Sequence, residues 1–145
     1  MSRIRGTHTK PEKLIRSALH RNGLRFRLHR RDLPGRPDIV FVRQRVAVFV
    51  HGCFWHQHDC PYATLPATRA EFWKAKLAGN VRRDQRVLEQ LKQDRWRVLI
   101  VWECAVRGSG RHSPAELADG IDAFLERDTI LYELRGKSLS SAPSK

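Results

Sequence analysis

The feature that most constrains this chain is a short segment crowded with metal-ligating side chains, His51-Gly52-Cys53-Phe54-Trp55-His56-Gln57-His58-Asp59-Cys60. It holds two of the three cysteines and three of the seven histidines of the whole chain. The third cysteine, Cys104, lies far along the chain, at the end of an apolar run that begins at Val98. Because structural zinc sites are usually closed sets of four Cys and His ligands, the sequence predicts a loop that folds around one zinc ion.

We expect the zinc ligands to be Cys53, His58, Cys60 and Cys104. With all four positions filled by protein, such an ion has no open position and is structural rather than catalytic. The alternative is that the cysteines are buried apolar side chains, which are common in protein cores. A loop dense in His, Asp and Gly is a poor place for such burial, so we favour zinc. Three polar side chains of the segment are then left over for other chemistry: His51, His56 and Asp59.

The charge of the chain indicates a polyanionic partner. Among 145 residues there are 28 basic and 15 acidic side chains, a formal net charge of +13. Nucleic acid is the default partner of so basic a domain; the alternative is a basic surface that serves only solubility. We find no secretory signal and no apolar run long enough to cross a membrane. We therefore expect a cytoplasmic protein, in which three cysteines suit metal binding better than disulfides.

Capping boxes and apolar periodicity predict an α/β domain. The boxes mark helix starts at residues 9–12, 68–71 and 113–116, and Gly79-Asn80 is expected to break the second helix in two. The expected strands cover residues 24–28, 38–42, 46–50 and 96–102. The middle two form a hairpin, and the last is continuously apolar enough to be central. The sequence predicts one domain over residues 1–136, with a mixed β-sheet flanked by helices. After the helix from 113 we expect only a loose end, with a disordered tail at 137–145.

Three acidic residues are candidates for metal or acid–base chemistry. Asp38 stands at the mouth of an apolar strand, where a carboxylate can hold Mg²⁺; the alternative is an ordinary turn aspartate. In a hairpin it would lie close to Val50 and His51. Glu12 has a capping role in the first helix or reaches the metal through water. Asp84 belongs to a solvated helix face or holds the imidazole of His56 in one tautomer.

The aromatic residues near the Cys/His segment suggest contact with bases. Phe54 and Trp55 are consecutive in a polar loop, where two large rings are hard to bury together. Exposed apolar side chains can act as wedges that unstack DNA bases. Trp73, which follows Phe72, is a third candidate wedge, with core packing as the alternative. The arginines that we expect to contact phosphates are Arg25, Arg27, Arg30, Arg31, Arg36, Arg43 and Arg45.

These motifs resemble the very short patch repair (Vsr) DNA mismatch endonucleases. The similarity runs from about Arg5 to Gly108. It includes the segments 9–12, 33–38, 51–56, 66–69, 71–73, 80–84 and 96–104. The resemblance implies a restriction-endonuclease-like fold and a structural zinc site. It also implies an Mg²⁺-dependent enzyme that nicks one DNA strand beside the thymine of a T:G mismatch, the lesion left by deaminated 5-methylcytosine.

The resemblance also implies roles for particular residues. It assigns the metal-binding aspartate to Asp38, the catalytic histidine to His56 with Asp84 as its partner, and the glutamate near one or two Mg²⁺ ions to Glu12. The zinc ligands fall on Cys53, His58, Cys60 and Cys104, and the intercalating aromatics on Phe54, Trp55 and Trp73. The strand at 46–50 has apolar Val48-Phe49-Val50 where the wider nuclease superfamily has an acidic residue and a lysine. In Vsr-like enzymes this strand supplies a backbone carbonyl to Mg²⁺, a role that the resemblance assigns to Val50.

Two other functions remain open from the sequence. One is a nuclease of the same fold with another DNA target, such as a restriction-associated or structure-specific enzyme. The other is a non-catalytic zinc DNA-binding module, which the joint presence of the four candidate catalytic residues disfavours. The expected partner is double-stranded DNA with a T:G mismatch, a MutL-like repair protein is a further candidate, and we expect a monomer.

Overall fold

The computed structural model describes residues 10–56, 58 and 65–137 as one mixed sheet with helices on both sides. The strands, in the order β1-β2-β3-β4-β5 across the sheet, are β1 Arg27–Leu28, β2 Ile39–Phe41, β3 Val46–His51, β4 Arg97–Trp102 and β5 Leu131–Leu134. The helices are α1 Lys10–Arg21, α2 Ala70–Gln93 and α3 Pro114–Leu125, with a 3-10 turn η2 at Glu103–Ala105. The predicted α/β class with a mixed sheet is confirmed.

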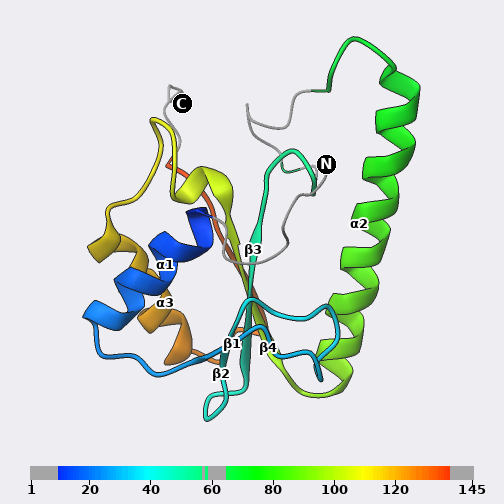
Figure 1. Cartoon of the computed structure of the whole chain (residues 1–145). Helices are drawn as coiled ribbons and strands as arrows, with labels where there is room; N and C mark the ends of the chain where they lie inside the picture. The colour runs from blue at the N-terminus through cyan, green and yellow to red at the C-terminus, as the bar shows by residue number, and fades with distance from the viewer. Residues whose placement is uncertain (1–9, 57, 59–64, 138–145) are drawn as a thin grey trace.

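The sheet lies between α1 and α3 on one face and α2 on the other (Figure 1). Its side chains alternate between two cores, as the period of a strand requires. Val46 and Val48 of β3 pack with the residues of α1 and α3, whereas Ala47 and Phe49 pack on the side of α2. Because β3 and β4 are covered on both faces, their sequences are continuously apolar.

Strand pairing explains how distant parts of the chain meet at one end of the sheet. β2 and β3 form the predicted antiparallel hairpin, with Ile39 opposite Val48. β3 and β4 run parallel, and His51 at the end of β3 lies opposite Trp102 at the end of β4. Parallel strands end at the same edge, so the Cys/His segment after β3 lies beside Cys104, which follows β4. β3 is the middle strand of the five, and β4, which was predicted to be central, lies between β3 and β5.

Two predictions about the helix after the Cys/His segment are wrong. α2 is one continuous helix of 24 residues that runs through Gly79 and Asn80. A glycine inside a helix costs only about 1 kcal/mol, which burial of Leu77 and Leu91 offsets. The predicted capping box at 68–71 is also absent: the N-cap is Arg69, in the left-handed region at φ 57°, with no side-chain hydrogen bond to the helix end.

The ends of the sheet differ from the prediction as well. The strand expected at 24–28 is reduced to Arg27 and Leu28, because only these two residues pair with β2. The loose end expected after α3 is wrong, since Leu131–Leu134 forms β5 beside β4. The strand is short and mostly exposed, so its sequence shows no alternation of polar and apolar residues.

The capping boxes predicted for α1 and α3 have different outcomes. The capping box of α3 is confirmed: the Ser113 side chain accepts a hydrogen bond from the Glu116 amide, and Glu116 accepts one from the Ser113 amide. For α1, Thr9 lies outside the described residues. Of the tail expected at 137–145, residues 138–145 also lie outside the described residues. Its first residue, Lys137, is described, and the Lys137 amide donates to the Gly110 carbonyl (2.8 Å). In the described part of the chain, no helix combines the length and apolarity that a membrane crossing needs.

Candidate active site

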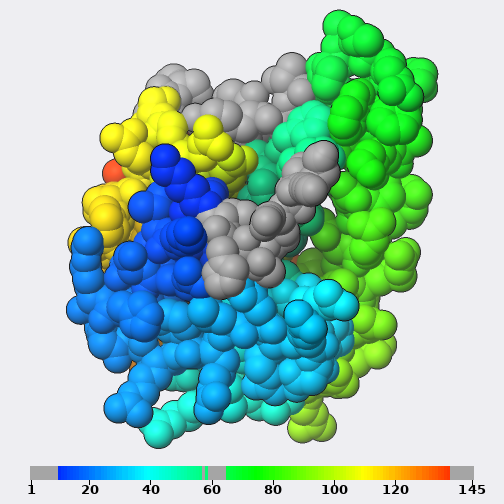
Figure 2. Space-filling view, viewed as in Figure 1, coloured from blue at the N-terminus to red at the C-terminus, as the bar shows by residue number. Residues whose placement is uncertain are grey.

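A cleft of about 940 Å³ opens at the carboxyl end of β3, on the side of α2. Figure 2 shows the first turns of α2 against the segment that follows β3. The cleft lining includes four residues that the sequence predicted for catalysis or Mg²⁺ binding: Asp38, Val50, His56 and Asp84. The residue before β2, strand β3, the segment after β3 and helix α2 therefore supply one site.

The hairpin places Asp38 against the end of β3. The Asp38 amide donates to the Val48 carbonyl (3.0 Å), and Asp38 Oδ2 accepts from the Val50 amide (2.7 Å). The N–H and C=O of one strand residue point to the same side, so the Val50 carbonyl faces the side of Asp38. The predicted proximity of Asp38 and Val50 is confirmed, and two oxygen donors of the kind that Mg²⁺ prefers meet there.

The electrostatics of Asp38 favour a bound cation. Burial raises the pKa of Asp38 to about 7; the hydrogen bond from Val50 opposes this shift, and the negative charge of Glu12 adds to it. A cation at this carboxylate would offset both the lost hydration and the repulsion from Glu12. The fit of oxygen donors and charge therefore supports the prediction of a metal at Asp38.

Glu12 is buried beside two cleft residues, His29 and Asp38, and does not lie on the surface of α1. Its residue is 1% exposed, and its carboxylate oxygen Oε2 is 2.7 Å from His29 Nε2 and 3.5 Å from an Arg16 nitrogen. One ligand atom from each of Glu12, His29 and Asp38 can be chosen so that all three lie within 4.8 Å of one another. The predicted closeness of Glu12 to Asp38 is thus present. His29 is a cleft residue that the sequence did not single out.

His56 and Asp84 form the second part of the site. His56 Nδ1 is 2.6 Å from Asp84 Oδ2, which α2 carries across the cleft. This contact makes Nδ1 the donor and leaves Nε2 able to accept a proton. The His56 amide also donates to the Gly52 carbonyl (3.1 Å). The predicted pairing is present, and Asp84 is not simply a solvated residue of the helix face.

His51 joins this pair, although the sequence left it without a role. Its ring stacks on that of His56, with centroids 3.7 Å apart and planes 3° from parallel. Burial, followed by the charge of His56, lowers the pKa of His51 to about 3, against the opposing effect of Asp84. His51 is therefore neutral in the folded protein near neutral pH. The sequence signal was its position at the last residue of β3.

Three of the four predicted zinc ligands come together behind the cleft. Cys53, His58 and Cys104 are buried, and His58 Nδ1 is 3.5 Å from Cys53 Sγ and 3.6 Å from Cys104 Sγ. A tetrahedral zinc ion with ordinary Zn–S and Zn–N bonds would hold such atoms about 3.6 Å apart. The spacing and the donor types fit zinc. The fourth predicted ligand, Cys60, and the spare candidate Asp59 lie outside the described residues.

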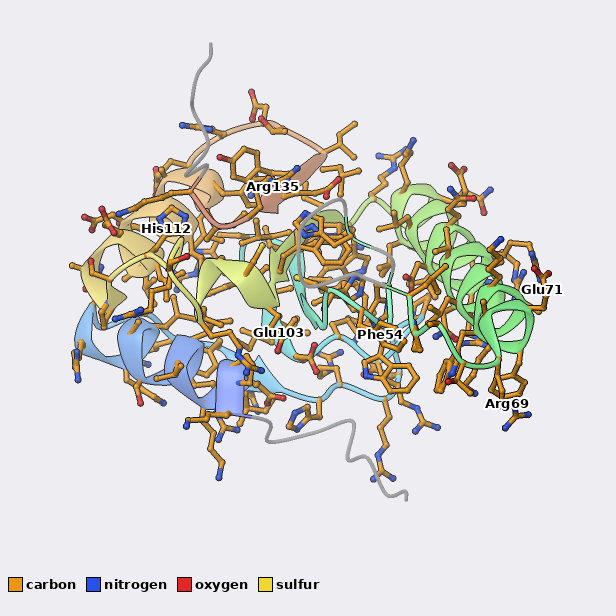
Figure 3. The ribbon with its side chains drawn as sticks, turned by 90° about the horizontal axis from the view of Figure 1, so that it is seen from above. Phe54, Arg69, Glu71, Glu103, His112 and Arg135 are labelled. Atoms are coloured by element: carbon orange, nitrogen blue, oxygen red, sulfur yellow. The ribbon has the colours of Figure 1, made fainter. Side chains whose placement is uncertain are left out.

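Glu103 connects the predicted zinc ligands with the cleft, and the sequence did not single it out. Its Oε1 accepts from the Cys53 amide (3.3 Å), and its other oxygen pairs with Arg107. It lines the cleft beside Gly52 and lies on η2, between β4 and the loop after it (Figure 3). The carboxylate therefore connects the end of β4 to the turn that begins the Cys/His segment.

The predicted wedge residues form one aromatic cluster at the mouth of the cleft. The centroids of Phe54 and Trp55 are 5.1 Å apart, and Trp73 lies 5.6 Å from the first and 5.9 Å from the second. All three are only half-buried, which disfavours the core alternative for Trp73. Figure 3 shows Phe54 between the sheet and the start of α2. The Asn80 side chain fixes the Trp55 carbonyl (3.0 Å) across this gap.

Five of the seven predicted phosphate-binding arginines line one of two separate hollows. Arg31 and Arg36 line the cleft, together with Lys76 and Arg83 of α2, which the sequence did not single out. A separate hollow is lined by Arg25, Arg27 and Arg43. Arg30 is paired with Asp32, and Arg45 stacks on Trp96. The structure thus brings to the cleft only two of the seven arginines named from the sequence.

Comparison with known proteins decides the family. The family model described as DNA mismatch endonuclease Vsr matches residues 1–62. DNA mismatch endonuclease Vsr of Escherichia coli (strain K12) is 44% identical over 125 residues, which cover 86% of this chain and 80% of that protein. The chain belongs to the Vsr family. It is therefore an endonuclease, and the family resemblance that the motifs indicated is confirmed.

Other proteins similar to this Vsr-family chain carry the name of nicking enzymes. Type II nicking enzyme V.XorIIP of Xanthomonas oryzae pv. oryzae is 50% identical over 110 residues, covering 76% of this chain and 81% of that protein. Type II nicking enzyme V.NmeAIP of Neisseria meningitidis serogroup A is 36% identical over 107 residues, covering 74% and 76%. The similarity extends beyond residue 62, so it includes regions that carry Asp84 and the aromatic cluster.

Proposed function

We propose that this Vsr-family endonuclease nicks one strand of duplex DNA beside the thymine of a T:G mismatch, with Mg²⁺ as its catalytic ion. The observation that carries the proposal is a single cleft with three parts. It contains a half-buried carboxylate at Asp38, a histidine held by a carboxylate at His56 and Asp84, and a half-exposed aromatic cluster at its mouth. These parts suit metal binding, proton transfer and insertion between bases.

Asp38 and the Val50 carbonyl are the residues that would hold Mg²⁺. When bound there, Mg²⁺ would polarise the scissile phosphate and stabilise the leaving oxygen. Glu12 lies close enough to accept hydrogen bonds from water around the ion. Glu12 is buried and Asp38 is half-buried, so their interaction with a cation would be less screened by water than at the surface.

His56 would take the proton from the attacking water. The contact between His56 Nδ1 and Asp84 fixes the ring so that Nε2 has its lone pair free for that proton. The carboxylate of Asp84 then stabilises the charged imidazolium that forms. His51 is neutral under the same conditions, so the stacked pair holds at most one positive charge.

The aromatic cluster would recognise the mismatch through deformability. A T:G wobble pair costs less to unstack than a matched pair, and inserted rings gain contact with the bases that they separate. Phe54, Trp55 and Trp73 are close enough to act as one wedge. Arg31 and Arg36 would bind phosphates at the cleft, a contribution that weakens with salt.

A structural zinc ion is the proposed support for this arrangement. It would be held by Cys53, His58, Cys104 and, from the sequence, Cys60. Because the same segment carries His56 and the first two wedge residues, zinc loss is expected to unfold the site rather than alter its chemistry. A MutL-like repair protein and a location at the nucleoid also belong to the proposal.

The test is nicking of an end-labelled duplex with one central T:G pair, compared with the matched T:A duplex, in Mg²⁺. The expected result is a single cut beside the thymine of the T:G duplex, lost in Asp38→Ala and His56→Ala. Equal cutting of both duplexes would show a nuclease with a different target. Mismatch binding without any cut, in the zinc-loaded enzyme, would contradict the catalytic part of the proposal.

The wedge is tested by Phe54→Ala, Trp55→Ala and Trp73→Ala. Each variant should lose affinity for the T:G duplex more than affinity for the T:A duplex, because only the mismatch binding uses insertion. Phe26→Ala is a control aromatic substitution, since Phe26 lines the separate hollow. Equal losses on both duplexes would exclude the wedge as the source of discrimination.

A further inference from the structure

We propose that Glu12, His29 and Asp38 form a mixed nitrogen and oxygen metal site, in which His29 is a direct ligand and which favours Mn²⁺ over Mg²⁺. The inference rests on the proposed metal-dependent function and changes its ligand set. The oxygen donors of the proposed Mg²⁺ site come from Asp38 and Val50 alone. A third protein ligand that is an imidazole would alter which ion this nuclease binds best.

The separations between the ligand atoms of Glu12, His29 and Asp38 are similar to those between ligands that share one metal ion. His29 Nε2 lies 2.7 Å from Glu12 Oε2, and one ligand atom of Asp38 lies within 4.8 Å of both residues' ligand atoms. Neighbouring ligands on an octahedral ion with bonds near 2.1 Å are about 3.0 Å apart, and opposite ligands about 4.2 Å. Both values lie within or close to the observed range. The three side chains therefore need only small movements to share one ion.

The backbone of His29 takes an uncommon conformation and is hydrogen-bonded to that of Asp38. His29 has a φ of 48°, in the left-handed region, and its amide donates to the Asp38 carbonyl (3.1 Å). Residues other than glycine seldom take this conformation, and positions that do so are enriched at ligand sites. The hydrogen bond joins the backbone of one proposed ligand to that of another, so His29 and Asp38 are positioned as a unit.

The surroundings supply negative charge in a buried place. Glu12 is fully buried, and His29 and Asp38 line the cleft. Arg16 lies 3.5 Å from Glu12, and its single positive charge is smaller than the summed negative charge of the two carboxylates of the group. The third histidine-containing group, His51, His56 and Asp84, has only one carboxylate. A divalent cation is thus favoured at Glu12, His29 and Asp38 over the neighbouring group.

The ligand types decide the choice of ion. Carboxylate and carbonyl oxygens suit Mg²⁺ and Mn²⁺ alike, whereas an imidazole nitrogen favours transition metals over Mg²⁺. Mg²⁺ also keeps several water molecules and seldom accepts a nitrogen ligand. Replacing one water by His29 therefore adds to the affinity for Mn²⁺ and adds little for Mg²⁺. The thiolate group at Cys53 and Cys104 binds softer ions, so Mn²⁺ and zinc need not compete for one site.

The test measures Mn²⁺ and Mg²⁺ binding to the full, zinc-loaded chain without DNA, by calorimetry and by pulsed electron paramagnetic resonance of Mn²⁺. We expect Mn²⁺ to bind at least about tenfold tighter than Mg²⁺, with a directly bonded ¹⁴N in the resonance spectrum. His29→Gln should lose the ¹⁴N coupling and about tenfold in Mn²⁺ affinity, while Mg²⁺ affinity changes by less than about threefold. His20→Gln, an exposed histidine on α1, is the matched control and should match the native chain.

Two results would overturn the proposal. One is a ¹⁴N coupling that persists in His29→Gln and disappears in His56→Ala, which would place the ion on the other histidine group. The other is equal affinity for Mn²⁺ and Mg²⁺ in the native chain. Circular dichroism and zinc content confirm that His29→Gln is folded. Because no DNA is present, failure here leaves the T:G nicking result unchanged, and failure to nick T:G leaves the metal measurement intact.

Discussion

The two sides of the cleft use the same residue types in opposite proportions. Glu12, His29 and Asp38 supply two carboxylates and one imidazole, whereas His51, His56 and Asp84 supply two imidazoles and one carboxylate. In each group the ligand atoms lie within 4.8 Å of one another. With neutral histidines the first group carries two negative charges and the second only one. Spacing alone therefore does not distinguish the two groups, but their charges differ. We call the side with Glu12, His29 and Asp38, which we propose binds the metal, the metal side, and the side with His51, His56 and Asp84, which we propose transfers the proton, the acid–base side.

Burial strengthens the difference between the two sides. On the metal side it raises the pKa of Asp38 to about 7, and the charge of Glu12 adds to this shift. On the acid–base side burial lowers the pKa of His51 to about 3. Without a bound cation, the lost hydration of Asp38 and its repulsion from Glu12 thus destabilise the first side. The second side keeps one histidine neutral while its stacked neighbour, held by Asp84, is available for a proton.

The largest expected effect follows from removing the charge on the metal side. Asp38→Asn should reduce T:G nicking by more than about 10⁴-fold, because the ion acts on both charge and geometry of the phosphate. The amide oxygen can still accept from the Val50 amide, so the fold should be kept. Single-turnover nicking with saturating enzyme measures the effect. A loss of less than about tenfold would mean that the ion is held elsewhere.

A smaller loss is expected on the acid–base side. His56→Ala should reduce single-turnover nicking by about 10²–10⁴-fold, the usual contribution of a general base. Metal binding without DNA should be unchanged, because the metal ligands lie on the other side of the cleft. Asp84→Asn should give a smaller loss of the same kind. If His56→Ala instead abolished metal binding, the division between the two sides would be wrong.

The pH dependence of metal binding should report Asp38 specifically. A proton and the ion compete for this carboxylate, so Mg²⁺ affinity should be constant above about pH 8 and fall about tenfold per unit below pH 7. Calorimetric titration with Mg²⁺ at pH 6.0, 7.0 and 8.5, at constant ionic strength, measures this. His51→Gln should show the same curve. A flat profile in the native chain would place Asp38 in a more hydrated environment than the structure shows.

The sequence was informative where a local pattern decides the outcome. The hairpin of β2 and β3, the capping box at Ser113 and the pairing of His56 with Asp84 all follow from short motifs or family likeness. It was wrong where packing overrides local preference. α2 continues through Gly79 because its buried residues offset the glycine, and β5 exists because β4 offers a free edge to pair with.

The candidate site was only partly predictable for a related reason. Residues such as Asp38 stand at a strand mouth and can be recognised from the chain around them. His29 and Glu103 reach the cleft through a left-handed backbone and a turn after β4, which no periodicity encodes. Their contacts join segments 17 and 50 residues apart. Only the three-dimensional arrangement shows that an imidazole lies beside the two carboxylates of the proposed metal site.

The smallest expected effect is on stability, where the two sides should respond to pH in opposite directions. Asp38 binds its proton more tightly when folded (pKa about 7) than at its ordinary value of 3.8, so its contribution is full below about pH 4 and lost as the pH rises through 7. In zinc-loaded protein without Mg²⁺, Asp38→Asn should therefore increase the free energy of unfolding at pH 8 by on the order of 2 kcal/mol.

For His51 the sign is reversed, because its folded pKa of about 3 lies below the ordinary 6.5. Its contribution is full above pH 6.5 and falls as the pH decreases toward 3, by up to about 1.4 kcal/mol per unit. Between pH 4 and 6.5 the two slopes nearly cancel in the native chain. Urea unfolding at pH 5, 6.5 and 8 should show stability rising with pH in Asp38→Asn and falling with pH in His51→Gln. Parallel profiles in the two variants would mean that burial does not distinguish the two sides of the cleft.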